Sequence, residues 1–140
     1  MVFSMALICF IALSSGCQRD GLHAVSGAVT LDGIPVTDGT ISFMSAGDSG
    51  GSAGATIQNG TYSARVSPGK MIVKVYSERS LTEEEIKAYK SNPMTRSSIT
   101  PAEQVKKQVI PEIYNDRSTL IVEISENRKN LDFHLEAKTN

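Results

Sequence analysis

The residues of this chain whose chemistry suggests a function are one serine, one cysteine and two histidines. Ser49 lies in the pentapeptide GDSGG of the stretch SAGDSGGSAGA, residues 45–55, a setting in which a serine can act as a nucleophile in acyl transfer. Cys17 ends an apolar segment, and His23 and His134 lie near the two ends of the remaining chain. Each of these groups needs partners, so the elements that position them decide what chemistry is possible.

The residues around Ser49 resemble the GDSGG motif of chymotrypsin-like proteases. Catalysis of that kind requires a histidine base, an aspartate that orients it, and backbone donors for the oxyanion. In that family the histidine and the aspartate precede the serine, but here only His23 does, and residues 23–49 cannot form the two barrels that assemble a triad. Ser52 also stands where the motif continues with proline. We therefore do not expect Ser49 to be a nucleophile.

The glycine and serine content of residues 45–55 suggests a different role for this stretch. Four glycines and three serines supply flexibility and little to pack. We expect a mobile loop between a strand that ends near Met44 and a strand that begins near Ala55.

The first segment of the chain differs from the rest. MVFSMALICFIALSSGC has no charged side chain, and residues 2–13 are apolar apart from Ser4. About a dozen apolar residues are too few to span a bilayer, which takes roughly twenty, but are typical of a signal peptide. We therefore expect residues 1–16 to be a signal peptide.

The pentapeptide LSSGC resembles the lipobox of bacterial lipoproteins, in which a small residue precedes a cysteine that is lipidated on sulfur. Ser14 stands where leucine is usual, and Leu13 lies one residue further back. The resemblance implies that Cys17 is the lipid attachment site and that residues 17–23 form a tether. It also implies an outer-membrane lipoprotein of the bacterial cell envelope that faces the periplasm or the cell exterior. Ordinary secretion and an uncleaved anchor are the alternatives.

Cysteine and histidine usage predicts neither a disulfide nor a metal. Cys9 would leave with the signal peptide, so the mature chain would keep only Cys17. No second cysteine or histidine stands at ligand spacing, and His134 alternates with Phe133 and Leu135, which indicates an outward position on a strand. We therefore expect both histidines to be surface residues, and we expect no cofactor.

Charge argues against a nucleic-acid partner. The 140 residues include 14 Lys and Arg against 15 Asp and Glu, which gives a formal net charge of -1. Binding to a phosphate backbone needs a basic excess, and stacking on single strands needs aromatic residues interleaved with basic ones. Neither is present.

Alternating apolar residues predict an all-β domain over residues 24–140. Seven short strands emerge, with inward faces formed by Val25, Gly27, Val29, Leu31; Ile41, Phe43; Ala55, Ile57; Tyr62, Ala64, Val66; Met71, Val73, Val75; Leu120, Val122, Ile124; and Leu131, Phe133, Leu135. Tight turns are expected at Asp32-Gly33, Asp38-Gly39 and Asn59-Gly60, and the segment SENRKN is expected to close a last hairpin. The pattern predicts a seven-stranded antiparallel β-sandwich.

Residues 77–118 break the β rhythm between the fifth and sixth predicted strands. LTEEEIKAYK carries a capping box, with Thr82 as the cap and Glu85 three residues later, so we expect a helix that stops before Asn92-Pro93. A further turn or two could begin at Thr100 and end at Pro111.

The strand and turn order resembles the carboxypeptidase regulatory-like (transthyretin-like) β-sandwich domain over residues 24–76. The matching positions are Gly27, Val29, Asp32, Gly33, Pro35, Val36, Gly39, Ile41, Phe43, Asn59, Gly60, Tyr62, Pro68 and Gly69. The closing half, from IPEIYNDRS onward, resembles short lipoproteins of planctomycete-type bacteria. The resemblance implies the same sandwich fold.

These observations favour a non-enzymatic binding or structural module, anchored in the membrane through its lipid, with the insertion at 77–118 as its contact surface for a protein or cell-wall partner. The alternative is a small envelope hydrolase or a metal-assisted enzyme with an unrecognised site. Hydroxyisourate hydrolases share the transthyretin-like fold, but they end in Tyr-Arg-Gly-Ser, and this chain ends in LEAKTN. Asp32, Asp38 and Asp48 could cluster at the ends of the strands, and Glu83–Glu85 are expected to complement a helix dipole.

Overall fold

The computed structural model describes residues 21–47, 51–95 and 101–137. Three features discussed above lie outside these residues: Cys17, the Asp48-Ser49 pair, and the expected signal peptide at 1–16.

The described residues form ten strands, one α-helix and two 3-10 turns. The strands are β1 (His23–Leu31), β2 (Ile34–Pro35), β3 (Asp38–Ser45), β4 (Ser52–Gln58), β5 (Thr61–Val66), β6 (Gly69–Tyr76), β7 (Glu78–Ser80), β8 (Lys106–Gln108), β9 (Ile121–Ile124) and β10 (Phe133–Leu135). The helical elements are α1 (Glu83–Ser91), η1 (Ala102–Gln104) and η2 (Glu112–Tyr114). The prediction of an all-β chain is confirmed.

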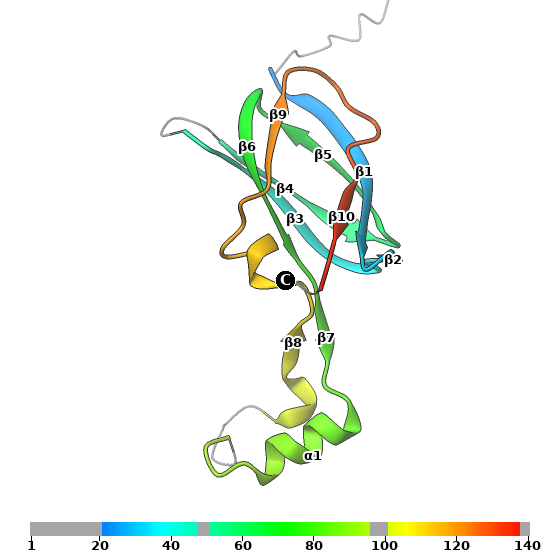
Figure 1. The fold of residues 1–140 in the computed structure, drawn as a ribbon, viewed down its shortest axis with the longest axis vertical. Coiled ribbons are helices and arrows are strands. Elements are labelled where there is room, and N and C mark those ends of the chain that lie inside the picture. Colours follow the sequence, from blue (N-terminus) through cyan, green and yellow to red (C-terminus); the bar gives the residue numbers. More distant parts are fainter. Residues whose placement is uncertain (1–20, 48–50, 96–100, 138–140) are drawn as a thin grey trace, which may run out of the picture.

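Most strands belong to one curled sheet with the order β10-β1-β5-β4-β3-β6-β9, and β2 pairs with β1 (Figure 1). Neighbouring strands are antiparallel except for β1 and β10, which pair in parallel with Val29 opposite Phe133. The predicted hairpin at SENRKN is therefore wrong, because β9 and β10 lie at opposite ends of the sheet order. The chain between them crosses to β1, where backbone hydrogen bonds join Arg128 and Leu131 to β1.

The core lies on the inward face that the alternation predicted. Among the predicted inward residues, those that are buried are Val25, Val29, Ile41, Phe43, Ile57, Tyr62, Ala64, Val66, Met71, Val73, Val75, Ile124, Leu131, Phe133 and Leu135. The rings of Phe43, Tyr62 and Phe133 form a cluster with centroid separations of 5.9 to 6.4 Å. Each large buried apolar side chain contributes about 1.5–3 kcal/mol before the entropy of ordering is subtracted.

Two of the predicted tight turns are confirmed by their backbone angles. Asp32 and Gly33 have φ of 50° and 78°, and Asn59 and Gly60 have φ of 51° and 79°, as a two-residue hairpin turn requires. The third prediction is wrong, because Gly39 lies inside β3. A Cβ at this position would be 2.3 Å from the carbonyl oxygen of Tyr76, so glycine is needed there for the close approach of two strands.

The loop predicted at 45–55 is shorter than expected. β4 begins at Ser52, and Ser52, Ala53, Gly54 and Ala55 all pair with β3. Ala55 packs against the core as predicted, and Ala53 does so as well, but the side chain of Ala53 is too small to extend the alternation visibly in the sequence.

The capping box of α1 is confirmed. Thr82 Oγ1 accepts a hydrogen bond from the Glu85 amide, the Glu85 carboxylate accepts one from the Thr82 amide, and the helix ends at Ser91. The turn expected after Thr100 is the single 3-10 turn η1, which ends at Gln104. Pro111 was expected to end a helix, but it precedes a second turn, η2.

Candidate functional site: the arm and its root

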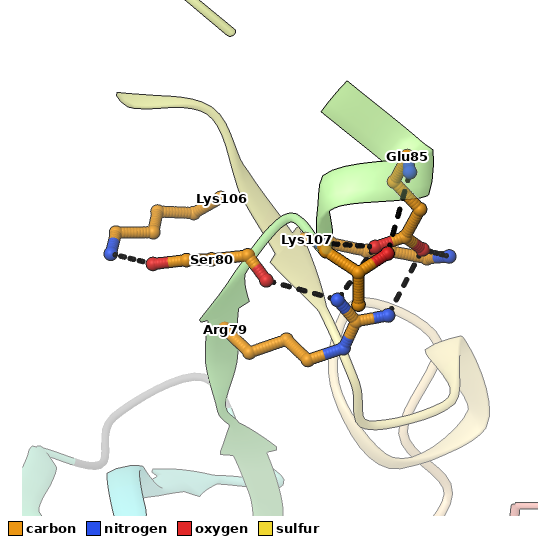
Figure 2. A network of polar contacts seen from close by, with 6 residues as sticks. Arg79, Ser80, Glu85, Lys106 and Lys107 are labelled. Carbon is orange, nitrogen blue, oxygen red and sulfur yellow. Dashed lines mark hydrogen bonds and ion pairs between the residues drawn. The ribbon is translucent and has the colours of Figure 1, made fainter. Parts of the chain in front are cut away.

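An arm, formed by the described residues 78–95 and 101–108, projects from the end of the sheet. β7 continues the direction of β6 beyond the sheet, and β8 returns beside it, with α1 and η1 at the far end (Figure 1). The two strands pair through Glu78 with Gln108, Arg79 with Lys107, and Ser80 with Lys106. Because side chains alternate along a strand, Arg79 and Lys107 point to the face that α1 covers, and Ser80 and Lys106 point to the other (Figure 2).

The Glu85 carboxylate joins α1 to the two-stranded ribbon of β7 and β8. Its Oε2 accepts hydrogen bonds from Arg79 Nη1 at 2.7 Å and from the Thr82 amide at 2.9 Å (Figure 2). Its Oε1 accepts from Lys107 Nζ at 2.6 Å and from Arg79 Nη2 at 3.0 Å. The hydrogen bonds from Arg79, then Lys107, then the Thr82 amide hold the pKa of this carboxyl far below its usual value of 4.5. The arm therefore carries a fixed, fork-shaped ion pair at its centre.

The arm buries very little of itself. None of the residues of α1 is buried, and Ala102 is the one buried residue among those described in the arm. A second ion pair, Lys90 Nζ to Glu103 Oε1 at 2.5 Å, joins α1 to η1. The helix is thus held by polar contacts, and its outer surface stays open to solvent.

Partly buried hydrogen bonds fix the root of the arm, which is formed by Ser77 and residues 108–110. Ser77 is buried, its hydroxyl donates to the Asp38 carbonyl at 2.6 Å, and its amide donates to Gln108 Oε1 at 2.9 Å. The same Gln108 oxygen accepts from the Val109 and Ile110 amides, each at 3.2 Å. These hydrogen bonds satisfy the polar groups at the root and hold the arm against the end of the sheet.

Two clefts flank the root. The polar cleft has a volume of about 520 Å³ and is lined by Asp38, Gly39, Thr40, Thr56, Tyr76, Ser77, Glu78 and Lys106. The apolar cleft, about 300 Å³, is lined by Leu31, Asp32, Ile34, Pro35, Val36, Thr37, Asp38, Ser77, Glu78, Arg79, Val109 and Ile110. Sheet and arm contribute to both, so each cleft depends on the fixed root.

Among the described residues that the sequence singled out, Asp32 shares one cleft with Asp38 and another with His134, whereas His23 lies apart from them. His134 is exposed, and its Nδ1 lies 3.0 Å from Thr30 Oγ1, whereas His23 is half-buried at the other end of β1. Asp32 Oδ1 accepts a hydrogen bond from the Ala137 amide, which is a structural role. Within residues 21–47, 51–95 and 101–137 there is no group of three or more His, Cys, Asp or Glu placed to hold a metal ion.

Sequence reasoning missed Arg79, Lys107 and Gln108. Glu85 was identified as part of the capping box and as a complement to the helix dipole. Its ion pairs were not identified, because the alternation of three-residue strands is too short to reveal which side chains face the helix. Arg79 and Lys107 lie opposite each other only in the folded chain, because α1 and η1 separate them in the sequence.

Comparison of the chain with protein-family models, with curated proteins and with solved structures finds no match. In the part of the chain that the structure describes, no helix has the length and apolar character needed to cross a membrane.

Proposed function

We propose that this chain is a lipid-anchored, non-enzymatic binding module of the bacterial cell envelope and that the arm makes its main contact. The observation that carries the proposal is the exposure of α1, which buries none of its residues although the Glu85 network holds it in place. Cys17 would attach the chain to the outer membrane, and the partner would be a protein or a cell-wall component.

The energetics of the arm support this role. Ordering each residue of the arm costs about 1–2 kcal/mol of backbone entropy, and the arm has one buried residue among those described with which to offset it. Exposed ion pairs contribute little to stability. An element that is ordered without filling a core is typical of surfaces kept for recognition, which are commonly mounted on a rigid β scaffold.

The proposed scaffold is the seven-stranded, carboxypeptidase regulatory-like sandwich, with its last strand parallel to its first. Two observations support it: the Asp32-Gly33 and Asn59-Gly60 turns have the expected positive φ, and the matching positions Ile41 and Phe43 are fully buried.

Site-specific photocrosslinking tests the arm as the contact surface. A photoreactive residue at exposed Lys87 on α1 is compared with one at exposed Lys129, in the chain between β9 and β10, in living cells. We expect a covalent adduct from position 87 and none from position 129. Equal adducts from both positions, or none from position 87, would refute the arm as the contact surface.

Metabolic labelling with palmitate tests the anchor. Cys17→Ala should abolish the label and release the chain from membranes, whereas Cys9→Ala, within the segment expected to be cleaved, should keep both. Label that persists in Cys17→Ala would show that the lipid is not attached there.

A further inference from the structure

The polar cleft at the root of the arm is open on the side that α1 leaves uncovered. Lys106 and Ser80 lie on the ribbon face opposite Arg79 and Lys107, and Lys106 Nζ donates to Ser80 Oγ at 2.9 Å (Figure 2). Glu78 lies two residues before Ser80, on the same face by alternation. This face of the ribbon meets the sheet at the polar cleft.

The sheet contributes a row of hydroxyl-bearing side chains to the cleft. Thr40 on β3 pairs with Thr56 on β4 and with Tyr76 on β6, so the three side chains lie side by side across neighbouring strands. They point away from the core, because the alternate residues Ile41 and Val75 are fully buried. Asp38 lies two residues before Thr40 on β3, so it is on the same face, and it is exposed beside this row.

The Tyr76 ring is held in one orientation. Its hydroxyl donates a hydrogen bond to Asp116 Oδ1 at 2.9 Å. This hydrogen bond is the main reason that the pKa of Tyr76 is raised, and it anchors the far end of the ring. A flat apolar surface of fixed direction therefore lies at the edge of a polar cleft.

We propose that this cleft binds a neutral saccharide. The inference rests on the proposed function and deepens it, since it assigns a ligand class to the root of the same arm. Sugar hydroxyls both donate and accept hydrogen bonds. Here the Asp38 and Glu78 carboxylates are acceptors, the Lys106 ammonium is a donor, and the threonine hydroxyls can do either. The apolar C–H face of a sugar ring can pack on the Tyr76 ring.

The charges and size of the cleft disfavour other small ligands. Two carboxylates against one ammonium repel an anion. Among the described residues no cluster of carboxylates and histidines could hold a metal ion, and no described side chain pairs with the Asp38 or Glu78 carboxylate. Both therefore remain available to sugar hydroxyls. A volume of about 520 Å³ lies within the usual range for organic ligands and suits a short oligosaccharide.

Calorimetric titration of the full chain in detergent tests the proposal. The probes are hexamers of β-1,4-linked N-acetylglucosamine, β-1,4-linked glucose and α-1,4-linked glucose, with a lysine-rich peptide as the cationic comparison. We expect at least one of the saccharides to bind and the peptide not to bind. Peptide binding without saccharide binding, or no binding of any hexamer, would overturn the proposal.

Matched variants locate the site. Asp38→Asn and Glu78→Gln should each weaken saccharide binding about tenfold or more, because each removes charged acceptors of hydrogen bonds. Glu123→Gln, an exposed carboxylate on β9, is the control and should bind as wild type does. All three positions are exposed, so the fold is expected to persist, and equal melting temperatures will check this. Unchanged affinity in both cleft variants would refute the assignment.

The two proposals can fail separately. An adduct from position 87 with no saccharide binding would overturn the saccharide site and leave the arm as the contact surface. Saccharide binding that depends on Asp38, with no adduct from position 87, would support the saccharide site and overturn the arm as the contact surface.

Discussion

Replacing Gly27 by alanine tests how the last strand is seated against the first. Gly27 lies on β1 opposite Tyr62, and an added Cβ would lie 2.1 Å from the Leu131 carbonyl oxygen. The buried Tyr62 hydroxyl donates a hydrogen bond of 2.7 Å to that same oxygen. Because both the oxygen and its carbon at 2.5 Å are backbone atoms, the segment that leads into β10 must move.

The contacts of Gly27 and Tyr62 determine how much free energy of unfolding each variant should lose. Overpacking of this kind costs about 1–3 kcal/mol of unfolding free energy in Gly27→Ala. Tyr62→Phe keeps the ring between Phe43 and Phe133 but removes the donor to Leu131, which costs about 1–3 kcal/mol. If the moved carbonyl has already lost its hydrogen bond, the double variant is less destabilised than the sum of the single variants, by about 1 kcal/mol.

Urea unfolding of the four proteins of this cycle provides the measurement. Gly54→Ala is the matched control, since its Cβ would lie 3.6 Å from the nearest described atom, the Ile41 carbonyl oxygen, and we expect a change within about 0.5 kcal/mol. If Gly27→Ala is as stable as Gly54→Ala, or if the two single effects simply add, the coupling through Leu131 does not exist.

Of two further predictions, one concerns the strand of the sheet next to the root of the arm and the other concerns the helix of the arm. Gly39→Ala should destabilise the protein by about 1–3 kcal/mol, because its Cβ would lie 2.3 Å from the Tyr76 carbonyl oxygen; an unchanged urea midpoint would contradict this. The lowered pKa of Glu85 makes its contribution to stability complete above about pH 5, and this contribution is lost as the pH falls from the ordinary value of 4.5 toward the lowered one. The measurement is hydrogen exchange of the α1 amides relative to the β1 amides, corrected for intrinsic rates. In wild type the relative exchange of α1 should become faster on acidification. In Glu85→Gln this increase should be much smaller. Equal pH dependence in both proteins would show that another group is responsible.

The sequence by itself determined the elements whose signals are local. Strict alternation, as in Met71, Val73 and Val75, gave the strands and their inward faces, because the side chains of a strand point to opposite sides in turn. Asp32-Gly33 and Asn59-Gly60 were recognisable as turns because few residues tolerate positive φ. The capping box of Thr82 and Glu85 was predictable because it closes within four residues.

The tertiary structure decided the features that depend on partners distant in sequence. Asp38-Gly39 has the composition of a turn, yet the backbone of β6 passes so close to it that glycine is required inside a strand. The parallel pairing of β10 with β1 follows from a crossing of the sheet that no local pattern records. Arg79 and Lys107 both reach Glu85 because β7 pairs with β8. The same pairing places Lys106 at the polar cleft that Thr40 also lines. Local chemistry therefore specified the strands, turns and helix, and long-range pairing created the arm and both clefts.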